Sequence, residues 1–174
     1  MKKWRQWLTS FTAAMALAGC SGLPEDITPV DNFDIDRYLG TWYEIARLDH
    51  RFERGLEQIS ATYSLNDDGT VKVLNRGRDI DSGEWKEAEG KAKFVGEPTV
   101  AHLKVSFFGP FYGGYGVFYL APDYSSALIV GNSKDYFWLL SRDPQLSEIE
   151  RERLIAIARD AGIATDELIW VQHD

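Results

Sequence analysis

Apolar and polar residues alternate in short runs through most of the chain between residues 38 and 141. In the clearest run, residues 58–65, one face carries apolar side chains at every second position: Ile59, Ala61, Tyr63 and Leu65. A period of two is the pattern of a half-buried strand. The sequence Asn-Asp-Asp-Gly that follows at residues 66–69 is typical of a hairpin turn.

Eight short β-rich runs occur in all, and later ones, such as residues 117–120, are apolar on both faces. We predict strands at Thr41–Arg47, Gln58–Leu65, Val71–Arg78, Glu84–Val95, Val100–Phe108, Tyr115–Ala121, Ala127–Gly131 and Tyr136–Ser141. Short turns rich in Gly, Pro, Asn and Asp separate them, so the connections are hairpins and not crossover helices. Eight consecutive antiparallel strands close most economically into an up-and-down barrel, because closure removes the exposed edges. The predicted fold is therefore all-β, an eight-stranded antiparallel barrel.

The periodicity changes after the eighth run. Ser147 and Glu150 form the S-x-x-E pattern of a helix start, and Gly162 supplies a stop. One narrow apolar stripe lies between them, at Leu154, Ile157, Ala158 and Ala161. We expect this single helix to pack on the outer wall of the barrel, and a short final strand at Leu168–Gln172 to return to the sheet.

The first residues have the features of an export signal. Lys2, Lys3 and Arg5 precede a short apolar run, and Leu17–Cys20 reads Leu-Ala-Gly-Cys, which resembles the bacterial lipobox. We expect residues 1–19 to be a cleaved signal peptide, Cys20 to be lipidated, residues 20–32 to form a tether, and residues 33–174 to form the domain. An ordinary cysteine of a signal region is the alternative for Cys20.

Charge and cysteine content narrow the partners. Removing three basic residues and no acidic ones takes the formal charge from −8 to −11, since −8 − 3 = −11. Such a surface repels nucleic acid and anionic headgroups, so covalent lipid has to provide the membrane attachment. Cys20 is the sole cysteine, which leaves the domain without a disulfide. Ser21, where an Asp would resemble an inner-membrane retention signal, favours the outer membrane.

Three signatures in chain order carry a family resemblance. Gly40-Thr41-Trp42 opens the first strand, Asp123-Tyr124 precedes the seventh, and Arg142 follows the eighth. The chain resembles the bacterial lipocalins over residues 32–172, with Pro122 where many members have Thr. The resemblance implies a calyx that binds a fatty acid or lysophospholipid, without a cofactor or metal, and a role in membrane maintenance or stress.

Strand parity gives the two ends of the barrel. The start of strand one, the turn between strands six and seven and the end of strand eight share one end, so Gly40, Trp42, Asp123, Tyr124 and Arg142 should form its base. There a guanidinium can stack on an indole and close the cup. For Trp42 the alternative is an ordinary core aromatic, and for Arg142 an exposed basic residue.

The opposite end should be the mouth. The loop at residues 48–57 carries Phe52 between Arg51 and Arg54, and Phe111, Tyr112 and Tyr115 lie on or beside the glycine-rich segment at residues 109–114. A basic and aromatic entrance suits a ligand with an anionic head and a hydrocarbon tail. In the alternative interpretation, the loop cations are solvated and pair with Glu53 and Glu57.

Phase along the strands predicts which residues face inward. Ala46 and Glu44 share the phase of Trp42, and Tyr136, Trp138 and Leu140 share that of Arg142. Outward-facing Phe137 and Leu139 should receive the helix. A carboxylate inside a dry barrel is costly unless it is paired, so Glu44 should contact Arg142 or a water associated with the ligand, unless a bulge displaces it to the rim.

Three functions remain open, and a binding module is favoured. An enzyme acting on a lipid would need a nucleophile with its base or a metal cluster, but His50, His102 and His173 are scattered and no catalytic motif occurs. A structural envelope lipoprotein with an incidental cavity is the third. Whether two barrels pair as a homodimer also stays open.

Overall fold

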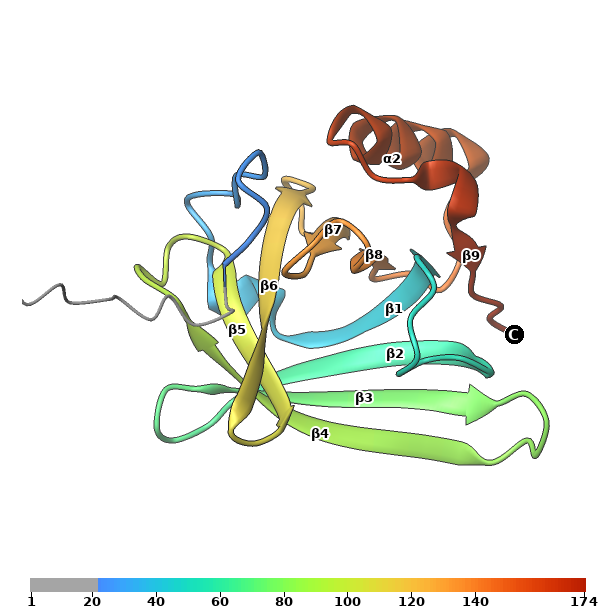
Figure 1. Cartoon of the computed structure of the whole chain (residues 1–174), viewed down its shortest axis with the longest axis horizontal. Coiled ribbons are helices and arrows are strands. Elements are labelled where there is room, and N and C mark those ends of the chain that lie inside the picture. Colours follow the sequence, from blue (N-terminus) through green and yellow to red (C-terminus); the bar gives the residue numbers. More distant parts are fainter. Residues whose placement is uncertain (1–21) are drawn as a thin grey trace, which may run out of the picture.

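A computed structural model describes residues 22–174 of the protein; the expected signal peptide and Cys20 lie outside them. Nine strands and two α-helices follow one another along the chain (Figure 1). Their bounds are α1 Ile35–Tyr38, β1 Gly40–Arg47, β2 Leu56–Leu65, β3 Val71–Asp79, β4 Trp85–Phe94, β5 His102–Phe108, β6 Phe111–Leu120, β7 Ser126–Val130, β8 Phe137–Ser141, α2 Glu148–Asp160, a 3-10 turn at Thr165–Glu167, and β9 Ile169–Trp170. The eight predicted strands are all present, and β6 begins four residues earlier than expected.

The sheet closes on itself. Consecutive strands pair antiparallel from β2 to β8, β8 pairs with β1, and β1 pairs back to β2 from Gly40 opposite Tyr63 to Tyr43 opposite Ser60. The ninth strand adds to β1, with Ala46 opposite Trp170. The predicted barrel and the predicted return of the C-terminus to the sheet are both confirmed.

Closure is incomplete along one seam. β4 pairs with β3 from Trp85 to Ala92, but it pairs with β5 only over Lys91–Phe94. Beyond that point the β5–β6 hairpin leaves the barrel wall. A pocket of about 500 Å³ opens at this seam, lined by Asn66, Lys72, Glu89, Gly90, Lys91, Ser106, Phe107, Gly109 and Tyr112.

The helix α2 covers the outside of β7, β8 and β1, as Figure 1 shows. Ser147 caps it by accepting a hydrogen bond from the Glu150 amide at 3.3 Å. An outer apolar cluster joins the stripe at Leu154 and Ala158 to Phe137 and Leu139. The predicted docking of the helix is thereby confirmed. None of the helices within residues 22–174 is long and apolar enough to cross a membrane.

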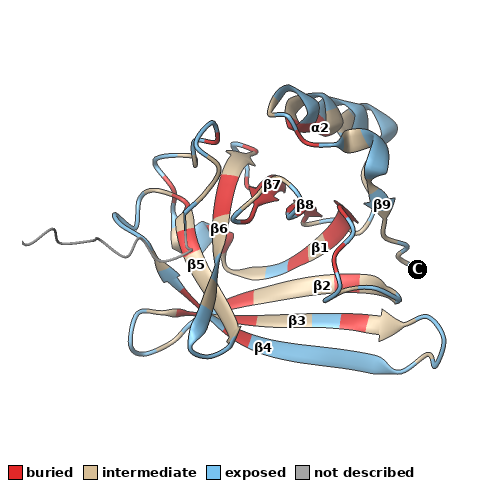
Figure 2. Cartoon of the chain, in the orientation of Figure 1, coloured by how far each residue is buried: buried red, intermediate tan, exposed pale blue. Residues whose placement is uncertain are grey.

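A second apolar cluster fills the part of the barrel interior around Trp42. Its buried members include Trp42, Tyr63, Val71, Val73, Leu103, Val117, Ile129 and Leu140. In Figure 2 the buried residues concentrate on the barrel strands, whereas β4 is exposed over the first half of its length. The molecule therefore has one core inside the barrel and another between the barrel and α2.

The segment before α1, expected as a tether, lies along the barrel wall. The Val30 amide donates to the Val117 carbonyl at 2.9 Å, and the Phe33 amide to the Thr99 carbonyl at 2.8 Å. Ile27 is buried in the outer cluster. The apolar residues of this segment are too few to show a periodicity in the sequence. In the structure the segment nevertheless hydrogen-bonds to the barrel and packs against its outer surface.

Candidate functional site

The floor of the barrel is an indole packed against an aromatic ring and a guanidinium. Trp42 is fully buried, and its Nε1 donates to the Tyr38 carbonyl at 2.8 Å. The Tyr38 ring lies 4.8 Å from the indole, centroid to centroid, and the Arg142 guanidinium carbon lies 4.0 Å from the ring centroid. Arg142 also donates to the carbonyls of Arg37, Tyr38, Leu39 and Thr41 at 2.8–3.1 Å. The floor is thus sealed by packing and by satisfied hydrogen bonds.

The turn between β6 and β7 joins this floor. Tyr124 adopts a φ of 62°, and its hydroxyl accepts from the Asp34 amide at 3.0 Å while Arg37 lies over its ring at 4.0 Å. Asp123 caps the turn by accepting from Ser125, and these hydrogen bonds lower the pKa of its carboxyl. The Pro122 carbonyl accepts from Arg37, so proline leaves this turn well connected.

Gly40 is required where β1 leaves the floor. Its φ of 94° is one that L side chains rarely adopt, and a Cβ there would approach an Arg142 nitrogen to 3.3 Å. The five residues expected at the base, Gly40, Trp42, Asp123, Tyr124 and Arg142, therefore lie at one end of the barrel.

Three tyrosine hydroxyls form the polar feature above the floor. Tyr115 Oη lies 2.7 Å from Tyr38 Oη and 2.8 Å from Tyr63 Oη. Burial raises the pKa of all three phenols, so each keeps its proton. Three O–H donors share two hydrogen bonds, which leaves one proton for water or a ligand.

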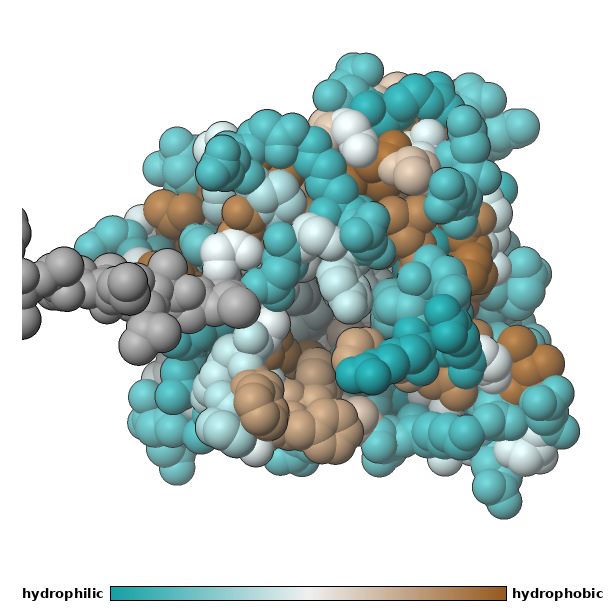
Figure 3. Space-filling model, viewed as in Figure 1, coloured by the Kyte–Doolittle hydropathy of each residue, from teal (hydrophilic) through white to brown (hydrophobic). Residues whose placement is uncertain are grey.

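The upper interior is accessible. Inward-facing apolar residues there are only partly buried, among them Val105, Phe107, Tyr115 and Trp138. Figure 3 shows the surface hollowed between the apolar β5–β6 hairpin and the hydrophilic loop after β1. The barrel is therefore packed at its floor and open above it.

A bulge in β1 changes which residues face this interior. The register between β1 and β8 shifts between Glu44 and Ala46, so Ile45 and Ala46 both pack in the outer cluster. The inward assignment of Ala46 is wrong for this reason, because one extra residue reverses the alternation. Arg47 takes the inward position in its place.

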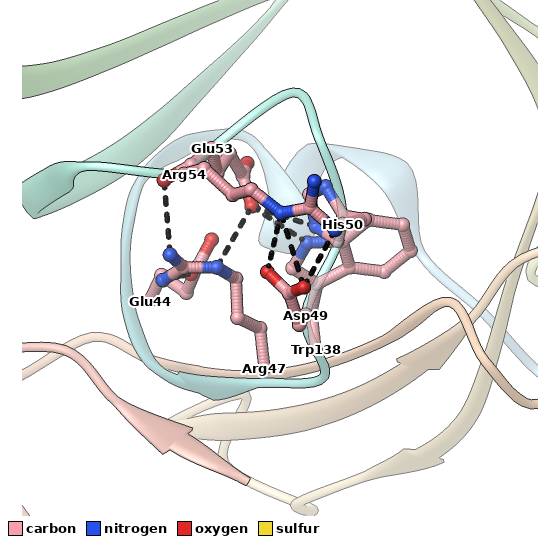
Figure 4. A network of polar contacts seen from close by, with 7 residues as sticks. All are labelled: Glu44, Arg47, Asp49, His50, Glu53, Arg54 and Trp138. Atoms are coloured by element: carbon pink, nitrogen blue, oxygen red, sulfur yellow. Dashed lines mark hydrogen bonds and ion pairs between the residues drawn. The ribbon is translucent and has the colours of Figure 1, made fainter.

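A buried ionic cluster lies beneath the loop after β1 (Figure 4). Arg47 Nη1 is 3.2 Å from Glu44 Oε1, and Arg47 Nη2 donates to the Glu53 carbonyl at 2.9 Å. The Glu53 carboxylate lies 2.9 Å from His50 Nε2 and accepts from Trp138 Nε1 at 3.2 Å. The partner of Glu44 is thus Arg47 and not Arg142, which remains below the indole at the other end of the barrel.

The two carboxyls of this cluster have opposite pKa shifts. Burial raises the pKa of Glu44 well above its ordinary value, and the nearby charge of Glu53 raises it further. Burial also acts to raise the pKa of Glu53, but the close contact with His50 and the hydrogen bond from Trp138 outweigh it, and that pKa is lowered. The Glu53 carboxyl therefore ionises more readily than the Glu44 carboxyl, and its contacts fasten the loop.

The loop and rim residues differ in their partners. Arg54 pairs with Asp49 at 2.7 Å, whereas Arg51 lies 5.0 Å above the Phe52 ring, which is 59% exposed. Of the remaining predicted ligand contacts, Tyr136 and Phe111 are exposed at the rim of the barrel, and Leu140 is buried inside it. Tyr112 lies on the outer face, where its ring is near the ammonium groups of Lys93 and Lys104. Glu53 and Glu57 pair with His50, Arg47 and Arg78.

Several inward-facing residues were not singled out from the sequence. Tyr38 lies on the one-turn α1 ahead of the strands, and Arg47 follows the bulge, so phase counting does not reach either. Tyr63 lies on the apolar face of the alternating run at residues 58–65, and this alternation is the sequence feature that could have identified it. Within residues 22–174, no group of three or more His, Cys, Asp or Glu side chains could hold a metal ion.

Comparisons with known proteins agree with this geometry. Residues 33–173 match the family described as a lipocalin-like domain. The outer membrane lipoprotein Blc of Escherichia coli strain K12 is 54% identical over 164 residues, which cover 93% of each chain. The protein of that name from Vibrio cholerae serotype O1 is 51% identical, over 92% of this chain and 94% of the relative.

More distant proteins share the same architecture. Temperature-induced lipocalin-1 of Arabidopsis thaliana is 36% identical over 83% of this chain and 81% of its own. The solved structure of insecticyanin from Manduca sexta superposes with a TM-score of 0.68 over 88% of this chain and 87% of that one, at 19% identity, and so shares the fold. With its sealed floor, open mouth and matching domain, the chain belongs to the lipocalin family.

Proposed function

We propose that this protein binds the hydrocarbon tail of a fatty acid or lysophospholipid in its barrel, at the outer membrane, without transforming it. The observation that carries the proposal is a barrel sealed by Trp42 and Arg142 at one end, with partly exposed apolar side chains above. A chamber of this kind excludes water from a tail that enters by the mouth.

The expected affinity follows from the tail. Burying about 15 methylenes at about 0.8 kcal/mol each gives roughly 12 kcal/mol. Association and ordering of the chain cost about 4 to 15 kcal/mol, which leaves micromolar binding as the reasonable expectation. Affinity should therefore rise with chain length.

We place the ligand's anionic head at the mouth. Arg51 has no carboxylate partner among the ion pairs of residues 22–174, whereas Arg54 is already paired with Asp49. Arg51 is therefore the cation better placed to meet a carboxylate or phosphate, with the exposed Phe52 ring against the upper part of the tail.

Calorimetric titration with palmitic acid and with hexadecanol tests both parts of the proposal. Saturable binding of both supports the chamber, and its absence in delipidated protein would refute it. We expect Arg51→Ala/Arg54→Ala to weaken palmitic acid several-fold more than the alcohol. The matched control is Arg151→Ala/Arg159→Ala on the remote helix α2, which removes the same charge. Equal losses for acid and alcohol would refute the placement of the head.

The location rests on the resemblance of Leu17–Cys20 to a lipobox and on the relatives named outer membrane lipoproteins. Acyl chains on Cys20 would hold the domain at the membrane, because the acidic chain has no electrostatic attraction for it. The lipid-binding barrel would then lie beside the membrane, which is the source of its ligand.

A further inference from the structure

The β5–β6 hairpin ends in an exposed apolar tip. Phe108 and Phe111 flank the Gly109-Pro110 turn and are 74% and 79% exposed. From Val105 to Ala121 the chain carries no charged residue, although acidic and basic side chains are frequent elsewhere. Exposed neighbouring aromatics in a soluble domain mark an interaction surface.

The described chain begins at the rim of the mouth, beside the turn between β7 and β8. Asn132, in the turn between β7 and β8, donates to the Gly22 carbonyl at 3.5 Å and accepts from the Gly114 amide at 2.6 Å. Asp26 pairs with Lys134 of the same turn. Residues 22–26 are therefore held at the rim of the mouth, level with the middle of β6.

The position of Gly22 fixes the reach of the lipid anchor. Cys20 precedes it by two residues, which span at most roughly 7 Å of extended chain. From Gly114 to the tip at Gly109, five residues of strand span roughly 16 Å. Along the strand direction, the tip thus extends about 9 Å further than an anchored Cys20 can reach. Interfacial elements bury apolar side chains about 5 to 10 Å into the headgroup and acyl boundary.

We propose that the Phe108–Phe111 tip inserts into the surface of the phospholipid bilayer that holds Cys20, so that the mouth of the barrel faces the membrane. The proposal rests on the lipid anchor and barrel ligand of the proposed function. Lys93 and Lys104, whose ammonium groups lie 5.5 and 5.4 Å from the Tyr112 ring, are placed behind the tip to meet lipid phosphates. A tail could then pass from bilayer to barrel without crossing water.

A bilayer fits this surface better than a second copy of the chain. The two phenylalanine rings supply at most roughly 400 Å² of apolar area. A stable dimer buries about 800 Å² on each partner. Two aromatic side chains at the tip of a hairpin suit an interface that accepts a small wedge, where aromatic residues are enriched.

Two glycines allow a matched test on the lipidated full chain. A Cβ at Gly109, in the hairpin tip, or at Gly96, in the β4–β5 turn at the closed end, meets no atom within 4 Å. Because lipid occupies the thiol of Cys20, Gly109→Cys and Gly96→Cys each provide the single thiol for a nitroxide label. Each protein is reconstituted in vesicles of phosphatidylethanolamine and phosphatidylglycerol, and power saturation reports collisions with oxygen and with a water-soluble nickel complex.

We expect the label at position 109 to collide mainly with oxygen, as in lipid, and the label at position 96 mainly with nickel, as in water. Adding Phe108→Ser/Phe111→Ser should return the first label to the aqueous profile. Two aqueous labels, or the reverse assignment, would overturn the proposal. So would spin–spin broadening at position 109 that disappears on dilution with unlabelled protein, because it would identify a second copy as the occupant. An aqueous tip with intact palmitic acid binding refutes the docking alone, whereas a docked tip without such binding refutes the proposed function.

Discussion

Truncation of the floor, Trp42→Ala, is the most direct test of the sealed barrel. The indole is fully buried, and removal of a buried aromatic costs about 3 to 5 kcal/mol of unfolding free energy. Domains of this size are stable by about 5 to 15 kcal/mol in total. We therefore expect a variant that folds but has lost a large part of its stability.

The stack of Arg142 on the indole adds a separable part. The guanidinium is partly solvated, so a coupling at the lower end of the range for cation–π pairs, about 0.5 to 1 kcal/mol, is expected. Arg142→Met keeps an apolar stem, and the double variant completes a thermodynamic cycle. The loss of the Arg142 hydrogen bonds to the carbonyls of Arg37, Leu39 and Thr41 is common to both backgrounds and cancels.

Urea unfolding followed by far-UV circular dichroism measures both quantities, since it does not depend on tryptophan emission. A loss below about 1 kcal/mol for Trp42→Ala would refute the claim that this residue seals the floor. A coupling of zero would leave the seal intact and refute the contribution of the stack.

Three further outcomes are expected. Burial raises the pKa of Glu44 in the folded state above its ordinary value of 4.5, so stability should fall as pH rises from about 4.5 toward the raised pKa. Glu44→Gln should flatten this fall, and parallel urea profiles of variant and wild type between pH 4.5 and 8 would contradict the shift. Leu154→Ala in the outer cluster should cost about 2 to 5 kcal/mol of stability in the same assay without changing palmitic acid affinity, and a weakened affinity would show that the two cores are not separate. Cys20→Ala should move the protein from the membrane to the soluble fraction with an unchanged circular dichroism spectrum; its retention in membrane pellets would argue against the anchor.

The fold follows from local signals in the chain. The strands are marked by alternation or by short apolar runs and the turns by Gly, Pro, Asn or Asp, and the parity of eight strands then places Trp42 and Arg142 at one end. The helix is equally well marked by its cap and stripe. These features depend on neighbours in sequence, which is why the pattern predicts them.

The site is less predictable because it depends on irregularities. One bulge after Glu44 moves Ala46 out of the barrel and Arg47 into it, and the sequence Glu-Ile-Ala-Arg carries no sign of it. The cluster around Glu53 depends on how the loop after β1 folds back, which no periodicity describes. The path of residues 22–33 likewise rests on a few long-range hydrogen bonds.

The seam between β4 and the β5–β6 hairpin has a consequence for crowding. The first half of β4 offers unpaired backbone groups, which in a membrane-anchored protein would face many identical neighbours in two dimensions. Its outward side chains are charged and locally neutralised, with Glu87 near Arg76 and Glu89 near Lys72. Charges on an edge strand discourage edge-to-edge aggregation. The barrel can therefore keep a side opening without recruiting a neighbouring chain to fill it.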